Sequence, residues 1–252
     1  MSYSSNAPLK DRVAIVTGGS GGIGRETSKA LLENDATVVM SDRNRERGEK
    51  VARELGLEFF PADVTRSDEI HQLAQHVQSR FGRIDIAFNN AAIARCVPSE
   101  ECTVETWRNV IDTDLSGVFY CCREFGNVML AQGRGSIINM ASMSGLVSNV
   151  PQCQCAYNAS KAGVIMLTKS LAGEWAKRGV RVNSVSPGYV NTPMTPKDQI
   201  RSDWYDLWMT FSPMGRIAEP QEIAPAVVFL ASDASSFVTG SNLVVDGGYS
   251  CW

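Results

Sequence analysis

The chain has 252 residues, of which 44% are hydrophobic and 20% are charged, and its formal net charge is −3. This length fits one α/β domain over residues 1–252, and the charge gives no electrostatic reason to bind nucleic acid or an anionic membrane. No apolar stretch approaches the roughly 20 residues that cross a bilayer, and the start lacks the apolar core of a signal peptide. We therefore expect a soluble, cytoplasmic protein.

The seven cysteines and two histidines do not follow a metal-binding pattern. The cysteines at 121–122 and 153–155 have no second cluster at zinc spacing, and His71 and His76 are too far round a helix to share one face. We expect surface histidines, reduced and mostly buried cysteines, and no metal site among the side chains.

Strand patterns alternate with helical patterns along the chain. A strand over 12–18 precedes a helix over 25–34, a strand over 37–42 precedes a charged helix ending at Leu55, and a strand over 57–63 precedes a helix over 67–82. A strand over 84–91, a helix over 104–132, a strand over 135–142, a helix over 157–177 and a strand over 180–188 follow. An irregular, tryptophan-rich segment at 189–215 precedes a helix over 220–231 and a closing strand over 241–248.

Near-continuous apolar strands separated by helices are typical of a parallel sheet that is buried on both faces. The pattern predicts a single-domain, doubly wound (Rossmann) α/β fold of about seven strands with helices on both faces. Ligands bind such sheets outside the carboxyl ends of the strands. We expect the functional residues at those ends.

The segment TGGSGGIG (17–24) follows the first strand and opens the first helix. Glycines there allow a tight turn and let backbone N–H groups approach a pyrophosphate at the helix N-terminus. Asp42 ends the second strand, 18 residues after Gly24, where a carboxylate accepts both ribose hydroxyls of NAD and repels a 2′-phosphate. A helix-capping role for Asp42 leaves that spacing unexplained. Arg43 could hold a 2′-phosphate, but we expect Asp42 to dominate and to favour NAD over NADP.

Tyr157 and Lys161 stand four positions apart, on one face of a predicted helix. A lysine ammonium within about 4–6 Å favours a tyrosinate, so the pair predicts a tyrosine with a lowered pKa that exchanges a proton with an alcohol. Ser142 ends the preceding strand at the same edge of the sheet, and Ser144 is a second candidate for holding the substrate oxygen. Such pairs are common by chance; here the pair also follows a dinucleotide-binding turn.

These motifs make the whole chain resemble the short-chain dehydrogenase/reductase family. The resemblance implies that Ser142, Tyr157 and Lys161 are catalytic, with Lys161 also binding ribose. It places Asp114 in the position of the family's fourth catalytic residue, usually an asparagine that offers its backbone carbonyl to a water. We expect activity to be retained with aspartate there. The cofactor would contact Tyr157 and Lys161 together with Gly18, Ser20, Gly22, Ile23, Gly24, Asp42, Arg43, Asp63, Val64, Asn90, Ala91, Ala92, Pro187, Gly188, Val190, Thr192 and Met194.

The loop before Tyr157 carries several hydroxyl and amide side chains, which suit a substrate rich in hydroxyl groups. In this detail the chain resembles polyol dehydrogenases and ketose reductases, with substrate contacts expected from Ser144, Asn149, Gln154 and Tyr189. Alternatively these side chains merely solvate a loop. Segment 189–215 is predicted to be a substrate lid whose tryptophans exclude water, a dimer face being the other explanation.

Two other functions stay open. One is an NADPH-dependent reductase of 3-oxoacyl thioesters or other small ketones, which Asp42 and the polar loop disfavour. The other is an inactive, nucleotide-sensing protein, which the intact Ser142, Tyr157 and Lys161 disfavour. The resemblance also implies a homotetramer, with Mg²⁺ possible at the C-terminal carboxylate of Trp252.

Overall fold

A parallel β-sheet forms the centre of the protein in the computed structural model, which describes residues 8–195, 198 and 200–252. Among these residues seven strands lie in the order β3-β2-β1-β4-β5-β6-β7, and their number and parallel direction confirm the prediction from the sequence. Their bounds are β1 (Val13–Thr17), β2 (Thr37–Asp42), β3 (Glu58–Pro61), β4 (Ile86–Asn89), β5 (Gly135–Met140), β6 (Val180–Pro187) and β7 (Asn242–Val245). The order reverses between β1 and β4, where such sheets bind ligands.

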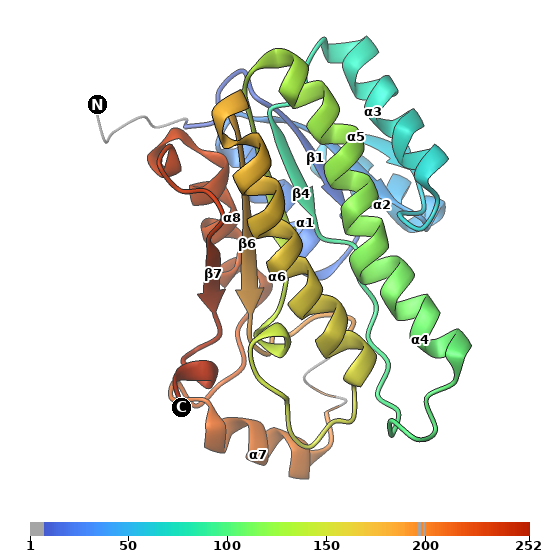
Figure 1. Cartoon of the computed structure of the whole chain (residues 1–252), viewed down its shortest axis with the longest axis vertical. Coiled ribbons are helices and arrows are strands. Elements are labelled where there is room, and N and C mark those ends of the chain that lie inside the picture. The colour runs from blue at the N-terminus through green and yellow to red at the C-terminus, as the bar shows by residue number, and fades with distance from the viewer. Residues whose placement is uncertain (1–7, 196–197, 199) are drawn as a thin grey trace.

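Helices cover both faces of the sheet (Figure 1). Their bounds are α1 (Gly22–Glu33), α2 (Arg45–Leu55), α3 (Ser67–Phe81), α4 (Val104–Ile111), α5 (Gly117–Gln132), α6 (Cys155–Trp175), α7 (Ser202–Phe211) and α8 (Ala224–Ala231). Short 3₁₀ helices are η2 (Met143–Gly145), η3 (Ala176–Arg178), η5 (Pro220–Glu222), η6 (Asp233–Ser235) and η7 (Tyr249–Cys251).

Alternate residues of each strand face opposite layers. Val13 and Ile15 of β1 pack in a cluster with residues of α3, α5 and α6, such as Phe125. Ala14 and Val16 point the other way, into a cluster with residues of α1 and α8. Because successive strand side chains alternate in direction, one apolar run supplies both cores. This burial explains why the strands read as continuous apolar segments.

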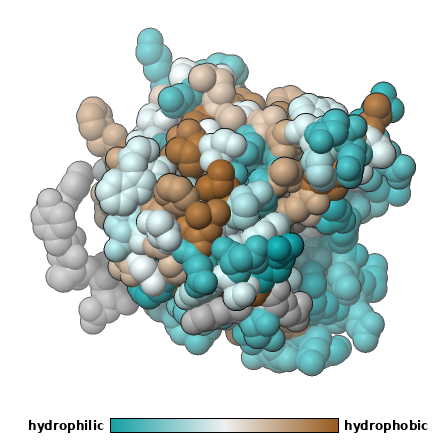
Figure 2. Space-filling model, turned by 90° about the horizontal axis from the view of Figure 1, so that it is seen from below, coloured by the Kyte–Doolittle hydropathy of each residue, from teal (hydrophilic) through white to brown (hydrophobic). Residues whose placement is uncertain are grey.

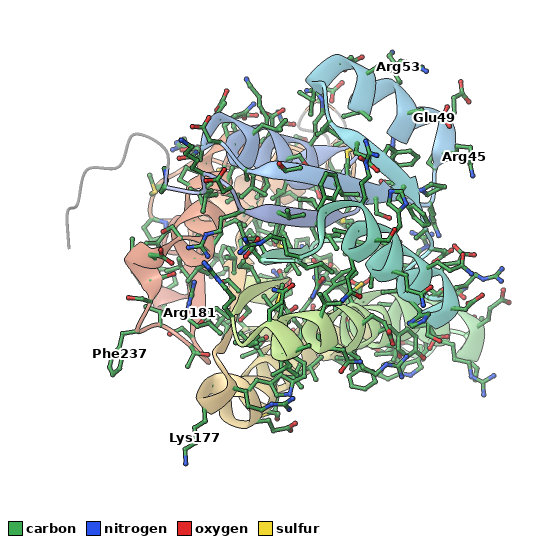
Figure 3. All side chains as sticks on the ribbon, turned by 90° about the horizontal axis from the view of Figure 1, so that it is seen from above. Arg45, Glu49, Arg53, Lys177, Arg181 and Phe237 are labelled. Carbon is green, nitrogen blue, oxygen red and sulfur yellow. The ribbon has the colours of Figure 1, made fainter. Side chains whose placement is uncertain are left out.

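The charged helix predicted to end at Leu55 is α2, and its charges face solvent. The side chain of Asn44 accepts a hydrogen bond from the Arg47 backbone N–H, which caps the helix. Arg45, Glu49 and Arg53 lie on the outer side of α2 (Figure 3). These three charged side chains therefore point to solvent, away from the core.

Three expectations need correction. The segment 189–215 is not wholly irregular, since it contains α7; three of its residues (196, 197 and 199) lie outside the described residues. The cysteines are free but not mostly buried, because only Cys121 and Cys122 are buried while three others are exposed. The predicted helix over 104–132 is continuous, but five residues of it, Asp112–Ser116 (η1), form a π-helical turn.

Among the described residues, no helix is long and apolar enough to cross a membrane.

Candidate active site

A cavity of about 900 Å³ opens at the carboxyl ends of the strands, a size typical of cofactor and ligand sites. Figure 1 shows α7 at this end, and Figure 2 views the molecule from it, with apolar and hydrophilic surface side by side. Most predicted site residues line the cavity: Gly18, Gly22, Ile23, Asp42, Arg43, Asp63, Val64, Asn90, Ala91, Ala92, Ser142, Ser144, Gln154, Tyr157, Pro187, Gly188, Tyr189, Val190, Thr192 and Met194. The structure thus brings together residues from segments far apart in the sequence.

The turn between β1 and α1 requires glycine. Gly18 has a φ of +62°, and a Cβ on Gly24 would lie 2.4 Å from the Gly18 carbonyl oxygen. The Asn90 amide donates hydrogen bonds to the carbonyls of Thr17 and Gly18, which ties this turn to the end of β4. A turn held this closely, at a helix N-terminus that faces a cavity, fits a pyrophosphate. Gly24 itself lies behind the lining and serves the turn by its lack of a side chain.

Asp42 lies at the end of β2 with only 7% of its surface exposed. Its carboxylate accepts hydrogen bonds from the Ser20 hydroxyl and backbone N–H and from the Asn44 backbone N–H. Ser20 therefore acts here as a buried partner of Asp42. Arg47, which sequence reasoning did not single out, also lines the cavity: its Nη2 lies 3.5 Å from Asp42 Oδ2, and its Nε donates to the Ser20 hydroxyl. The only signal for Arg47 in the sequence was its place as a basic residue in the first turn of the helix that follows Asp42.

Tyr157, Lys161 and Ser142 meet where α6 passes the end of β5. The hydroxyl of Ser142 lies beside the phenol of Tyr157 and acts to lower its pKa, and the Ser144 backbone N–H donates to Ser142 Oγ at 3.1 Å. The Lys161 side chain is fully buried, its Nζ lies 5.5 Å from the centre of the Tyr157 ring, and it donates to the Met140 carbonyl at 3.0 Å. A phenol, a hydroxyl and an ammonium so arranged can exchange a proton with an alcohol or carbonyl oxygen in the cavity.

Asp114 joins this group through its side chain, not only its backbone. Its fully buried carboxylate accepts a hydrogen bond from the Ile93 N–H at 2.8 Å and faces Lys161 Nζ at 3.4 Å. Burial raises the pKa of Asp114, while Lys161 and the Ile93 N–H oppose that rise. The sequence placed Asp114 at this site but did not predict the ion pair with Lys161.

The pKa of Tyr157 in the protein alone is not lowered as expected. Burial of the phenol raises its pKa above the usual value, and the Asp114 carboxylate adds to the rise. Lys161 and the Ser142 hydroxyl act in the opposite direction without reversing it. The effect predicted for Lys161 is present, but the expectation considered neither burial of the phenol nor the side chain of Asp114.

The polar loop before α6 is buried rather than solvated. The Gln154 amide nitrogen lies 3.0–3.3 Å from oxygens of Ser144, Asn149 and Asn158. Ser144 and Gln154 line the cavity, whereas Asn149 is absent from the described lining and lies behind Gln154. The alternative of a merely solvated loop is therefore wrong, and Asn149 braces the loop.

An aromatic wall closes the cavity beside α7. Tyr189 stacks on Trp208 with ring centres 3.8 Å apart, and Trp204 also lines the cavity. Gln152 links the stacked pair: its amide donates to the Tyr189 hydroxyl at 2.8 Å, and its carbonyl accepts from Trp208 Nε1 at 3.1 Å. Burial raises the pKa of Tyr189 well above its usual value, so this second tyrosine stays protonated. Sequence reasoning assigned Gln152 no role.

Nothing in the described residues suggests a side-chain metal site, since no three histidine, cysteine or acidic side chains cluster suitably. Trp252 is 77% exposed, and its indole N–H donates to the Phe211 carbonyl.

The parallel sheet, the glycine turn and the Ser142–Tyr157–Lys161 group are the features of an oxidoreductase that uses a pyridine nucleotide. Residues 18–250 match the family model described as enoyl-(acyl carrier protein) reductase. The chain is similar to galactitol 2-dehydrogenase (L-tagatose-forming) of Cereibacter sphaeroides, with 42% identity over 100% of both chains. It is also similar to the NADP-dependent mannitol dehydrogenase of Alternaria alternata, with 41% identity over 96% of this chain and 93% of that protein.

A short-chain type dehydrogenase/reductase from Mycobacterium marinum has a solved structure with a TM-score of 0.92, 37% identity and 98% coverage of both chains. The chain belongs to the short-chain dehydrogenase/reductase family and is an oxidoreductase acting on CH–OH groups.

Proposed function

We propose that this protein is an NAD-dependent dehydrogenase that interconverts a sugar alcohol and the corresponding ketose. The observation that carries the proposal is the meeting of the Ser142 hydroxyl and the Tyr157 phenol at the cavity surface, with the buried ammonium of Lys161 behind them. This group offers a proton acceptor and an oxygen-binding hydroxyl at one point.

In the oxidation, Ser142 holds the substrate hydroxyl and the deprotonated phenol of Tyr157 takes its proton. The Lys161 ammonium stabilises the phenolate and binds the cofactor ribose. A bound nicotinamide cofactor would supply the hydride acceptor for the carbon that bears this hydroxyl, so that the C–OH group becomes a C=O group. In the reduction, Tyr157 returns the proton to the carbonyl oxygen.

A polyol substrate is supported by the chemistry of the cavity wall. Ser144 and Gln154 place a hydroxyl and an amide near Tyr157, while Trp204 and Tyr189 offer aromatic faces to C–H groups. The relatives named above act, by their names, on galactitol and mannitol. The alternative of a 3-oxoacyl thioester substrate has no comparable support in a wall that carries this many polar groups.

NAD is the proposed cofactor because the buried carboxylate of Asp42 opposes a 2′-phosphate. Arg47 weakens this opposition, since its guanidinium lies beside the same carboxylate. The balance between Asp42 and Arg47 is therefore the point at which the proposal is open to test.

Three further properties accompany the proposal. Segment 189–215, with α7 at its centre, serves as the substrate lid. The protein assembles in the cytoplasm as a homotetramer, for which exposed apolar side chains on α4, α5 and α6, including Trp107, Phe119 and Met166, provide contact area. Mg²⁺ binds at the carboxylate of Trp252.

Steady-state kinetics test the proposal. NAD and NADP are each combined with pentitols, hexitols and 3-hydroxyacyl thioesters, and the Tyr157→Phe variant serves as the control. We expect NAD-linked oxidation of at least one polyol and a loss of at least about a thousandfold in Tyr157→Phe, whose ring still fits the site. Turnover of thioesters alone, or full activity of Tyr157→Phe, would contradict the proposal.

A further inference from the structure

A buried ion pair lies directly behind the tyrosine of the site. Asp114 and Lys161 are both fully buried, and Asp114 Oδ2 lies 3.4 Å from Lys161 Nζ. Asp114 Oδ2 has no hydrogen-bond partner among the described residues, while Oδ1 accepts from the Ile93 N–H. The free oxygen of the carboxylate is thus directed at the one ammonium beside Tyr157.

The π-helical turn η1 accounts for this placement. The Gly117 backbone N–H bonds the Asp112 carbonyl, five residues back, and such wide turns frequently occur at functional sites. Asp112, two residues before Asp114, points to solvent from the same turn. One turn therefore presents one aspartate to the site and another to water.

We propose that Asp114 is a positioning residue for the acid–base step. Its carboxylate offsets part of the Lys161 charge, so that the phenolate of Tyr157, which accepts the substrate proton, forms only at higher pH. The proposal rests on the function proposed above. It differs from a role of the backbone carbonyl alone, because it assigns the effect to the side-chain charge.

The surroundings of Tyr157 make the sign of the effect clear. Lys161 from α6 favours the phenolate, Asp114 from η1 disfavours it, and the neutral hydroxyl of Ser142, just after β5, favours it. Burial strengthens charge–charge effects because little water screens them. Removing the negative charge while keeping the side-chain shape should leave Lys161 less compensated. The phenolate then forms at lower pH.

Asp114→Asn isolates the charge, because an asparagine oxygen still accepts the Ile93 N–H bond. Asp112→Asn is the matched control: the same change in the same turn, at an exposed position. Ionisation of Tyr157 is followed by ultraviolet absorbance of the cofactor-free protein, as the difference between each protein and its Tyr157→Phe counterpart. This readout does not depend on turnover, so it separates failure of this proposal from failure of the proposed function.

We expect the Tyr157 midpoint to fall by about one pH unit in Asp114→Asn and to stay unchanged in Asp112→Asn. On the acid side of the kcat/KM profile for polyol oxidation, Asp114→Asn should then be up to about tenfold faster than the parent protein. An unchanged or raised midpoint in Asp114→Asn, in a protein whose Tm matches the parent, would overturn the proposal. So would an equal shift in Asp112→Asn.

Discussion

Arg47 should govern the choice between NAD and NADP. Its Nη2 lies 3.5 Å from Asp42 Oδ2, and its Nε lies 2.6 Å from Ser20 Oγ. We expect Arg47→Ala to leave the Asp42 charge uncompensated and to weaken NADPH binding relative to NADH. The perturbation removes one cation and leaves the glycine turn, Asp42 and Ser20 in place.

The magnitude follows from the distance and the exposure. Two unit charges 3.5 Å apart interact by about 1.2 kcal/mol in water and by about 5 kcal/mol at an effective dielectric constant of 20. The Arg47 side chain is 52% exposed, which puts the effect near the lower value, and exposed pairs contribute up to about 1 kcal/mol. About 1 kcal/mol corresponds to roughly a fivefold change in the ratio of the two dissociation constants.

Isothermal titration calorimetry with NADH and NADPH measures that ratio directly. Arg45→Ala is the control, because Arg45 lies on the same helix but pairs with Glu49 on its outer side. A ratio that stays within about twofold of the parent in Arg47→Ala, or that moves toward NADPH, would refute the reasoning.

Three other outcomes are expected. Gly24→Ala should lower NADH affinity, measured by calorimetry, by more than about tenfold, because the added Cβ would lie 2.4 Å from the Gly18 carbonyl oxygen and displace the turn. An unchanged affinity would mean that the turn tolerates a methyl group. Gln152→Leu should cost about 1–3 kcal/mol of unfolding free energy in urea and raise KM for the polyol, because Trp208 Nε1 loses its hydrogen-bond acceptor and the Tyr189 hydroxyl keeps only the longer bond from Asn149; unchanged values of both would count against the aromatic wall. If the Trp252 carboxylate binds Mg²⁺, removing the ion with EDTA should lower Tm, and adding Mg²⁺ should restore it. An unchanged Tm would exclude stabilisation of the protein by Mg²⁺ at this carboxylate.

The fold was predictable because the strands are buried on both faces. Val13 to Val16 read as one apolar run, and their alternate packing into two cores is the physical reason for that run. The glycine turn and the Tyr157–Lys161 pair were equally accessible, since each depends on local spacing along one element.

The features that the sequence did not predict depend on contacts between elements far apart in the chain. The pKa of Tyr157 is set partly by burial and by Asp114, which is 43 positions away in the chain and reaches the site through a π-helical turn. Arg47 meets Asp42 only because α2 folds back over the end of β2. Helix α7 was missed because its one buried residue, Trp208, packs on Tyr189, a residue outside the helix.

The π-helical turn also sets the relative rotation of α4 and α5, which form one continuous rod around it. Its five-residue hydrogen bond accommodates one residue more than an α-helical turn would. Because the turn takes up this residue, α4 and α5 keep their faces toward the core on both sides of it. Deleting one residue there would close an ordinary α-helical turn and change the direction of the side chains within it, including that of Asp114. The number of residues in this rod, as much as their identity, is therefore a condition for an intact acid–base site.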